Sequence, residues 1–420
     1  MTPAPATAPA PKARLRHRLG FGLSRELWLV EAGIFLNMLG YGAVLPFEII
    51  YLDDIRGFGL GVAGLVVGTL TGAAVVSAPL AGPLIDRFGP RVTMAGGGVV
   101  LAAGYAGLAF AHSPGQAFAA AALAGAGNGA LNPSQSALLA ALAPAGRRHR
   151  AAAVSRVAGN AGIGIGGALG GLVVTHGLPG FVAIFLLNAL TYLVYVGVLI
   201  VVVREGARPE PVSGGYRHVL RDRPFVQLAV THMAVIAVGW GVFNWLLPAY
   251  AGNHLGISTP MIGALLLVNA GTVVVAQVPA ARLAEGRRRT TMMALAAIIF
   301  AGACLLAIAA GASAGLAYPV LVAASVAVGI GECLHTTAVM PLVADLAPAA
   351  LRGRYLASIG FSWWIGLALA PSLGAQLLNH SPAVAFGVFA AVAATAGLSA
   401  LTLNRRLPEA ARLTPRPPKQ

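Results

Sequence analysis

Apolar runs of about 20 residues constrain the fold of this chain more than any other feature of its sequence. Hydrophobic residues make up 57% of the 420 residues, charged residues make up only 10%, and the mean hydropathy is +0.79. Such a chain has too few polar side chains to cover a water-soluble surface. The runs are long enough for α-helices to cross a bilayer, and the short alternating segments of a membrane β-barrel are absent. The sequence therefore predicts an all-α polytopic membrane protein.

We expect twelve transmembrane helices in two pseudo-symmetric bundles of six. Glycine and proline inside the apolar runs do not argue against this, because neighbouring helices satisfy the loosened backbone groups. The predicted spans cover residues 27–50, 60–83, 92–112, 115–142, 151–175, 179–203, 224–251, 258–281, 291–312, 316–345, 353–378 and 381–403.

The basic residues predict how the chain is oriented in the membrane. If the N-terminus is cytoplasmic, only Arg56 of the 28 Lys and Arg residues falls on the outer side of the twelve spans. This distribution follows the rule that cytoplasmic loops carry the excess of Lys and Arg, and an even number of spans places both termini in the cytoplasm. The formal net charge of +15 is thus a signal of topology in a multi-pass protein of the cell membrane, and we expect no binding of nucleic acid.

The longest charged connection, REGARPEPVSGGYRHVLRDR (Arg204–Arg223), divides the chain into two halves that resemble each other. LLAALAPAGRRHRAAAVSR (Leu138–Arg156) aligns without a gap with LVADLAPAALRGRYLASIG (Leu342–Gly360). An internal duplication of this kind is typical of transporters that work by alternating access. The predicted domains are a cytoplasmic N-terminal tail (1–26), an N-terminal bundle (27–203), a cytoplasmic linker (204–223), a C-terminal bundle (224–403) and a cytoplasmic C-terminal tail (404–420).

Charged residues are concentrated in the predicted inside loop between the second and third spans, GPLIDRFGPRVTM (Gly82–Met94). The loop resembles the signature of the major facilitator superfamily, Gly-x-Leu-Ala-Asp-Arg-x-Gly-Arg-Lys-x-x-Leu. The resemblance implies the twelve-helix fold of that superfamily and a gating loop, whose contacts form in one conformation and break in the other; a solvated turn is the alternative. The matching loop of the second half lacks the pattern, so we expect no second gate. The predicted gating residues are Gly82, Asp86, Arg87, Gly89 and Arg91.

The fifth span carries GIGIGGALGG, which resembles the helix-five motif of the drug/proton antiporters in the same superfamily, Gly-x-x-x-Gly-Pro-x-x-Gly-Gly. Glycines four apart expose backbone on one face, so that two helices can approach closely. The chain departs from the family at one further place, because Ala121 stands where the fourth span often has an arginine. The residues assigned to helix packing are Gly162, Gly166, Gly170 and Gly171, with Gly167 in place of the usual proline, and Pro371 at the equivalent place in the eleventh span.

Buried ionisable residues are costly in a membrane and are candidates for function. Glu332 lies near the middle of the tenth span, and His335, three residues later, falls on much the same face. Glu332 is either a proton-coupling carboxylate that His335 tunes or relays to, or a protonated structural residue. Glu31, in the first span, is either a second proton site or a residue that reaches the inner interface.

Other acids lie at the ends of the spans. Glu48, Asp53 and Asp54 flank the outer end of the first span, and we expect them to be solvated or part of an outer gate. Asp345 precedes Arg352 and Arg354 at the inner end of the tenth span, and we expect it to form an ion pair.

A substrate cavity between the halves would be lined by polar and aromatic residues of several spans, and interhelical hydrogen bonding is the alternative role of each. Few charges and several aromatic residues suit a moderately apolar, cationic substrate. The candidates are Asn37, Tyr41, Asn132, Arg156, Asn160, His232, Trp240, Asn244, Asn269, Trp363 and Trp364.

These features favour a secondary active transporter that couples proton entry to the efflux of small hydrophobic or cationic compounds. The alternative with the same fold is uptake or facilitated transport of a nutrient or metabolite. A receptor or membrane enzyme is a third hypothesis, but no catalytic constellation supports it. Lys12 and Lys419 are the only lysines, so a phosphate-binding loop that ends in lysine is excluded. We expect no cofactor and no metal, the proton gradient as energy source, the lipid bilayer as surroundings and a monomeric state.

Overall fold

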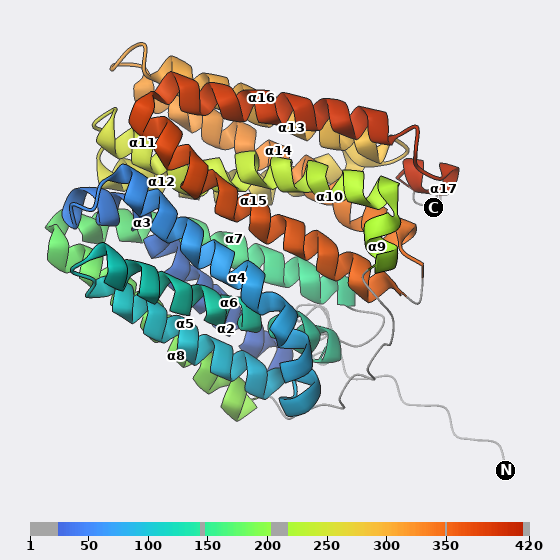
Figure 1. The fold of residues 1–420 in the computed structure, drawn as a ribbon, viewed down its shortest axis with the longest axis horizontal. Coiled ribbons are helices and arrows are strands. Elements are labelled where there is room, and N and C mark those ends of the chain that lie inside the picture. The colour runs from blue at the N-terminus through green and yellow to red at the C-terminus, as the bar shows by residue number, and fades with distance from the viewer. Residues whose placement is uncertain (1–23, 143–147, 203–216, 349–350, 415–420) are drawn as a thin grey trace, which may run out of the picture.

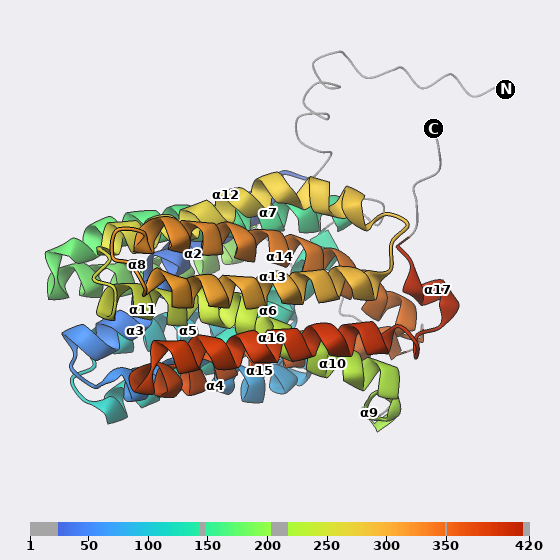
Figure 2. The same ribbon diagram turned by 90° about the horizontal axis from the view of Figure 1, so that it is seen from above.

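Long helices that run side by side form almost the whole molecule (Figures 1 and 2). The structure is a computed structural model, and it describes residues 24–142, 148–202, 217–348 and 351–414. Over these ranges the only β-type pairing is a single bridge between Arg288 and Leu413. The all-α fold predicted from the apolar runs is confirmed.

The first half of the chain forms the N-terminal group of helices, the lower part of Figure 1. Its first long helix changes its winding near its end, where 3₁₀, α and π turns follow one another. The elements are α2 (Arg25–Val44), η1 (Leu45–Phe47), α3 (Glu48–Ile50), η2 (Tyr51–Ile55), α4 (Leu60–Phe88), α5 (Pro90–Ala109), α6 (Pro114–Leu142), α7 (Arg148–Val173), η4 (Val174–His176) and α8 (Leu178–Val202).

The second half forms the C-terminal group, the upper part of Figure 1. Its first long helix is also irregular, because η5 is a π-helical segment. The elements are α9 (Arg217–Arg221), α10 (Arg223–Ile236), η5 (Ala237–Leu246), α11 (Leu247–Asn253), α12 (Thr259–Ala284), α13 (Arg289–Ala310), α14 (Ala317–Leu346), α15 (Arg352–His380), α16 (Pro382–Leu403) and α17 (Glu409–Arg412).

Eleven helical stretches among the described residues are long and apolar enough to cross a membrane. Each lies where a span was predicted. The helix at the predicted fourth span, α6, has 29 residues but is not among the eleven. Its sequence is built mostly of Ala, Gly and Asn rather than Leu, Ile and Val, so its mean hydropathy is low. Twelve spans therefore remain a prediction. Most of the predicted N-terminal tail and most of the linker lie outside the described residues, and the described end of the linker forms α9. The predicted C-terminal tail is described as far as residue 414 and contains α17.

The two groups meet through two pairs of helices, α4 with α15 and α7 with α12. Glycines allow close approach at one end of each pair. The backbone of α15 lies against Gly64, and Gln376 donates a hydrogen bond of 2.8 Å to the carbonyl of Gly61. In the second pair, Thr259 donates a hydrogen bond of 3.1 Å to the carbonyl of Gly171. We call this end, where α4 begins and α7 ends, the closed end.

The same helix faces are exposed toward the opposite end, which carries the loop at Gly89 and which we call the basic end. On α4, a Cβ placed on Gly72 or Gly82 would meet no atom within 4 Å. On α7, Val157 is 54% exposed, and on α12, Val274 is 50% exposed. The two groups therefore touch at the closed end and separate toward the basic end.

Candidate functional site

The predicted gating loop is a tight turn between α4 and α5. Gly89 has a φ of +82°, a value that favours glycine, and Pro90 then starts α5 with its fixed φ. The Arg91 guanidinium donates to the carbonyl of Ile200 at the end of α8, and that of Arg87 lies 5.2 Å from the Phe88 ring centre. These contacts stay within the N-terminal group. The Asp86 side chain lies outside the described residues, so the gating role stays a prediction.

Asp345, near the end of α14, forms an ion pair as the sequence analysis expects, and its partner Arg289 begins α13. Arg289, whose side chain is 3% exposed, donates a hydrogen bond of 2.6 Å to Asp345. The partner of Asp345 in this pair comes from the start of α13, whereas the sequence analysis noted Arg352 and Arg354 as the nearby basic residues.

Asp345→Asn is expected to lower the stability of the C-terminal group by roughly 1 to 2 kcal/mol, because it leaves a buried guanidinium without its counter-charge. The effect is at the low end for a charged hydrogen bond because Asp345 itself is 47% exposed. Thermal unfolding of the purified protein in detergent measures it. Glu285→Gln changes an exposed acid at the end of α12 and should leave the unfolding temperature unchanged; equal unfolding temperatures for both variants would contradict the assignment.

The glycine motif of α7 serves two neighbouring helices. Gly162, Gly166 and Gly170 face the backbone of α2, while Gly164 and Gly171 face α12 in the other group. Gly167, which stands where the drug/proton antiporters have proline, also faces α12, against Leu266. On α15, the carbonyl of Pro371 lies against Gly64. A Cβ at Gly162, Gly166, Gly170 or Gly171 would enter the space of backbone atoms, whereas one at Gly167 would press on the Leu266 side chain.

Glu332 is buried in α14 of the C-terminal group and is 6% exposed. The side-chain amide of Asn269, from α12, donates a hydrogen bond of 3.3 Å to its carboxylate. The charge of Arg156, an exposed residue of α7 in the other group, acts on this carboxylate. Among the described residues, the acid thus has one neutral donor and is within the electrostatic influence of one cation of the other group. In such an arrangement a carboxyl group can gain or lose a proton as the cation withdraws or approaches.

His335 bonds to another histidine and not to Glu332. Its Nε2 lies 2.8 Å from Nδ1 of His232, and both rings are buried. The ring of Trp240 lies 6.1 Å from that of His335 and 5.0 Å from that of Trp363. The outer ring nitrogens, Nε2 of His232 and Nδ1 of His335, are buried and have no hydrogen-bond partner in the part of the chain that the structure describes. Three candidates for the cavity, His232, Trp240 and Trp363, and one for proton coupling, His335, thus form a single aromatic cluster.

Glu31 is buried between helices of the N-terminal group. It is 2% exposed and accepts a hydrogen bond of 2.6 Å from Ser155 of α7, within the N-terminal group. Burial of the carboxylate between helices favours the proton-coupling role over the interfacial one, and both roles stay predictions.

The other cavity candidates are spread through both groups. Asn37 is fully buried within the N-terminal group. Asn132 donates to the side chain of Asn128, and Asn160 donates to the carbonyl of Arg156, so both form contacts within their own helices. Five of these candidates are half-buried, so that the side chain can still line a cavity: Tyr41, Asn132, Asn160, Asn244 and Trp364.

Glu48 differs most from its sequence interpretation, since it is 3% exposed rather than solvated. Its carboxylate accepts a hydrogen bond of 2.8 Å from the Trp245 indole, in the other group, and one of 3.1 Å from the Tyr105 hydroxyl. The sequence analysis singled out neither donor. A usable signal was present, because Glu48 stands between Phe47 and Ile49 inside an apolar run.

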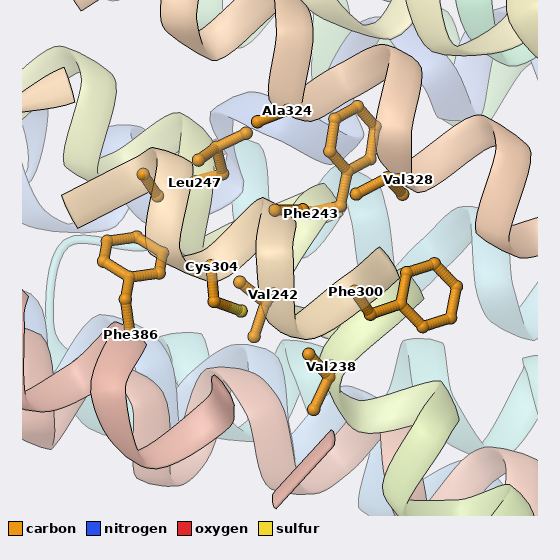
Figure 3. Close-up of a pocket in the computed structure, with 11 residues that line it drawn as sticks. Val238, Val242, Phe243, Leu247, Phe300, Cys304, Ala324, Val328 and Phe386 are labelled. Atoms are coloured by element: carbon orange, nitrogen blue, oxygen red, sulfur yellow. The ribbon is translucent and has the colours of Figure 1, made fainter. Parts of the chain in front are cut away.

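A small apolar cavity lies inside the C-terminal group, between η5, α13, α14 and α16 (Figure 3). Its lining residues are all apolar, among them Phe300, Phe386 and Cys304. Both cysteines, Cys304 and Cys333, are buried and free, as expected of thiols that act as small apolar side chains. The cavity offers no polar group that would orient a ligand.

Comparison with known proteins gives a consistent result. The sequence model of the Major Facilitator Superfamily matches residues 31–245 and 230–420. The uncharacterized MFS-type transporter YttB of Bacillus subtilis (strain 168) is 27% identical over 369 residues, which are 85% of this chain and 89% of that protein. The multidrug resistance protein MdtH of Aeromonas salmonicida (strain A449) is 25% identical over 359 residues, 83% of this chain and 85% of MdtH.

Solved structures share the fold at lower identity. A peptide transporter POT in complex with sulfate matches with a TM-score of 0.74 at 19% identity, over 94% of this chain and 97% of that one. A POT family transporter in complex with 5-aminolevulinic acid matches with a TM-score of 0.73 at 14% identity. At these identities the match concerns the fold alone.

Proposed function

The chain belongs to the Major Facilitator Superfamily, and from this premise we propose that it is a proton-coupled exporter of small hydrophobic or cationic compounds. It is an integral, multi-pass membrane transporter and not an enzyme. The proposal of efflux in exchange for protons is supported by the MdtH proteins, which are named multidrug resistance proteins. They are 24–27% identical to this chain. The transporter works as a monomer in the cell membrane.

The observation that carries this proposal is the environment of Glu332. An acid buried in a membrane helix is costly unless it is neutral or compensated, and such residues are typically functional. The amide of Asn269 can hydrogen-bond to the carboxyl group whether it is neutral or ionised. The positive charge of Arg156 compensates the ionised form. When the cation is near, the carboxylate is stabilised, and when the groups rearrange, the carboxyl group takes up a proton. We therefore expect the transporter to carry substrate in one direction and a proton in the other.

The orientation that we propose places both termini and the basic loops in the cytoplasm, according to the excess of Lys and Arg on that side. The basic end then faces the cytoplasm, and the closed end faces outward. In this conformation the space between the groups is accessible from the inside, where an exporter collects its substrate.

Asp86→Asn is expected to slow transport at least severalfold while leaving the protein folded. The charge of this loop would stabilise one of two nearly balanced conformations by ~1 kcal/mol, which is enough to change their ratio about fivefold. Substrate flux in vesicles measures the effect, and Glu285→Gln, an exposed acid in the corresponding loop of the other group, serves as control. Unchanged transport by the Asp86 variant would refute the gating role.

Flux in proteoliposomes with an imposed pH gradient tests the proposed function. We expect at least one compound in a panel of dyes, antibiotics and metabolites to cross the membrane in the direction opposite to the protons. Most of the transported compounds should be organic cations. Transport of a nutrient in the same direction as protons, or equally without a gradient, would replace export by uptake or facilitated passage.

A further inference from the structure

A hydrogen bond between Glu48 and Trp245 joins the two groups of helices near the closed end. Glu48 lies in α3, and Trp245 lies in η5 of the C-terminal group, at 2.8 Å between Oε2 and Nε1. Tyr105, from α5, donates to the other oxygen at 3.1 Å. The exposed fractions of Glu48, Trp245 and Tyr105 are 3%, 2% and 1%, so water is excluded from this contact.

The surroundings of Glu48 contain no cation among the residues that the structure describes. Both hydrogen-bond donors that the structure shows for its carboxylate are neutral. The titratable groups that face it are Tyr41 on its own long helix, Tyr105 on α5 and Tyr192 on α8, and the C-terminal group contributes Trp245. From α6, the residue that lines the same small cavity as Glu48 is Ala121. An ionised carboxylate without a cation is strongly disfavoured in such a site.

Both long helices that supply this contact are irregular there. η1 and η2 flank Glu48, while Trp245 lies inside the ten-residue π-helical segment η5. Turns of this kind inside a helix are frequent at functional sites, because they place side chains that a regular helix would not. The two helices are equivalent in the duplicated chain, each being the first long helix of its group.

We propose that Glu48 is a proton-binding site, and that the closed end forms only over its protonated carboxyl group. In that form the carbonyl oxygen accepts the Trp245 N–H, and the hydroxyl group forms its hydrogen bond with Tyr105. When the groups separate at this end, Trp245 withdraws, water reaches Glu48 and the proton leaves. The inference rests on the proposed alternating access, and it adds a site distinct from Glu332 that links proton uptake to closure.

The distance between spin labels at the closed end tests the site without any measurement of transport. The labels are placed by His112→Cys and Ser313→Cys, two exposed positions in the loops after α5 and α13; the native cysteines are buried. Because closure binds one proton, the ratio of separated to closed molecules should rise with pH by up to about tenfold per unit. Glu48→Gln should stay closed from pH 5 to pH 8.

Trp245→Phe separates the role of the proton from that of the contact. It removes a hydrogen bond but keeps the titratable acid, so the separated form should increase about tenfold at every pH while the pH dependence remains.

A matched control removes other titratable groups that lie at the same end of the same two helices. In the wild type, Asn253 donates to Asp53 and Asp54 across the groups, and His254 lies beside Asp53.

The variant Asp53→Asn/Asp54→Asn/His254→Gln should keep the wild-type pH dependence, because the two acids are only partly buried or exposed. The proposal is overturned if the wild-type distance does not respond to pH, if Glu48→Gln responds as the wild type does, or if this control abolishes the response. Failure of proton-driven flux with an intact distance response would instead count against the proposed function alone.

Discussion

Glu332→Gln is expected to abolish transport driven by a pH gradient, reducing it at least tenfold, while exchange of substrate without a gradient continues. Glutamine keeps the size of the side chain and can still accept the hydrogen bond from Asn269, but it cannot exchange a proton. Gradient-driven uptake into inverted vesicles and substrate exchange at equal pH, measured on the same preparation, separate the two activities.

The matched control is Glu31→Gln, which neutralises the other buried carboxylate among the proton candidates. Glu31 bonds to Ser155 within one group of helices and faces no described cation of the other group. We therefore expect a smaller effect on gradient-driven transport. If the pH dependence survives in Glu332→Gln and is lost in Glu31→Gln, the proton site is Glu31 and Glu332 is structural.

Gly64→Val is expected to keep the closed end from forming. A Cβ at Gly64 would enter the space of the Pro371 carbonyl and of Ala375 on α15, so the two groups could no longer approach. Overpacking of this kind costs about 1 to 3 kcal/mol, which corresponds to a change of about 5- to 150-fold in the ratio of separated to closed molecules.

The distance between labels at positions 112 and 313 measures this ratio, and Gly72→Val provides the comparison. Gly72 lies two helical turns further along α4, where a Cβ would meet nothing within 4 Å. The same side chain should therefore leave the closed end intact. Equal distance distributions for the two variants would show that the glycines of α4 do not determine the approach of the groups.

Much of the fold could be predicted from the sequence, because membrane helices are specified by local composition. The apolar runs predicted the positions of eleven spans. The charged residues Arg87, Arg91 and Arg289 lie at turns between helices. The helix α6 is long but less apolar than the other spans, since it is rich in small residues. The irregular segments η2 and η5 were not predicted, because π turns depend on tertiary contacts rather than on local sequence.

The candidate site was predicted residue by residue, but its contacts were not. Burial of Glu332 and His335 followed from their place in an apolar run. Their partners, Asn269 and His232, come from other helices, and periodicity within one helix cannot reveal them. Of the two interpretations of Glu48, the solvated one is wrong, because the packing of the other group covers an acid that lies near the end of a predicted span. The other interpretation, part of an outer gate, stays a prediction.

Proton movement during transport tests the central claim most directly. Proteoliposomes that contain a trapped pH-sensitive dye and no initial pH gradient are given a concentration gradient of a transported organic cation. Movement of the compound into the lumen should raise the luminal pH, because protons leave in exchange, and Glu332→Gln should remove this change. Accumulation of the compound with no change in luminal pH, or with acidification, would contradict proton-coupled antiport.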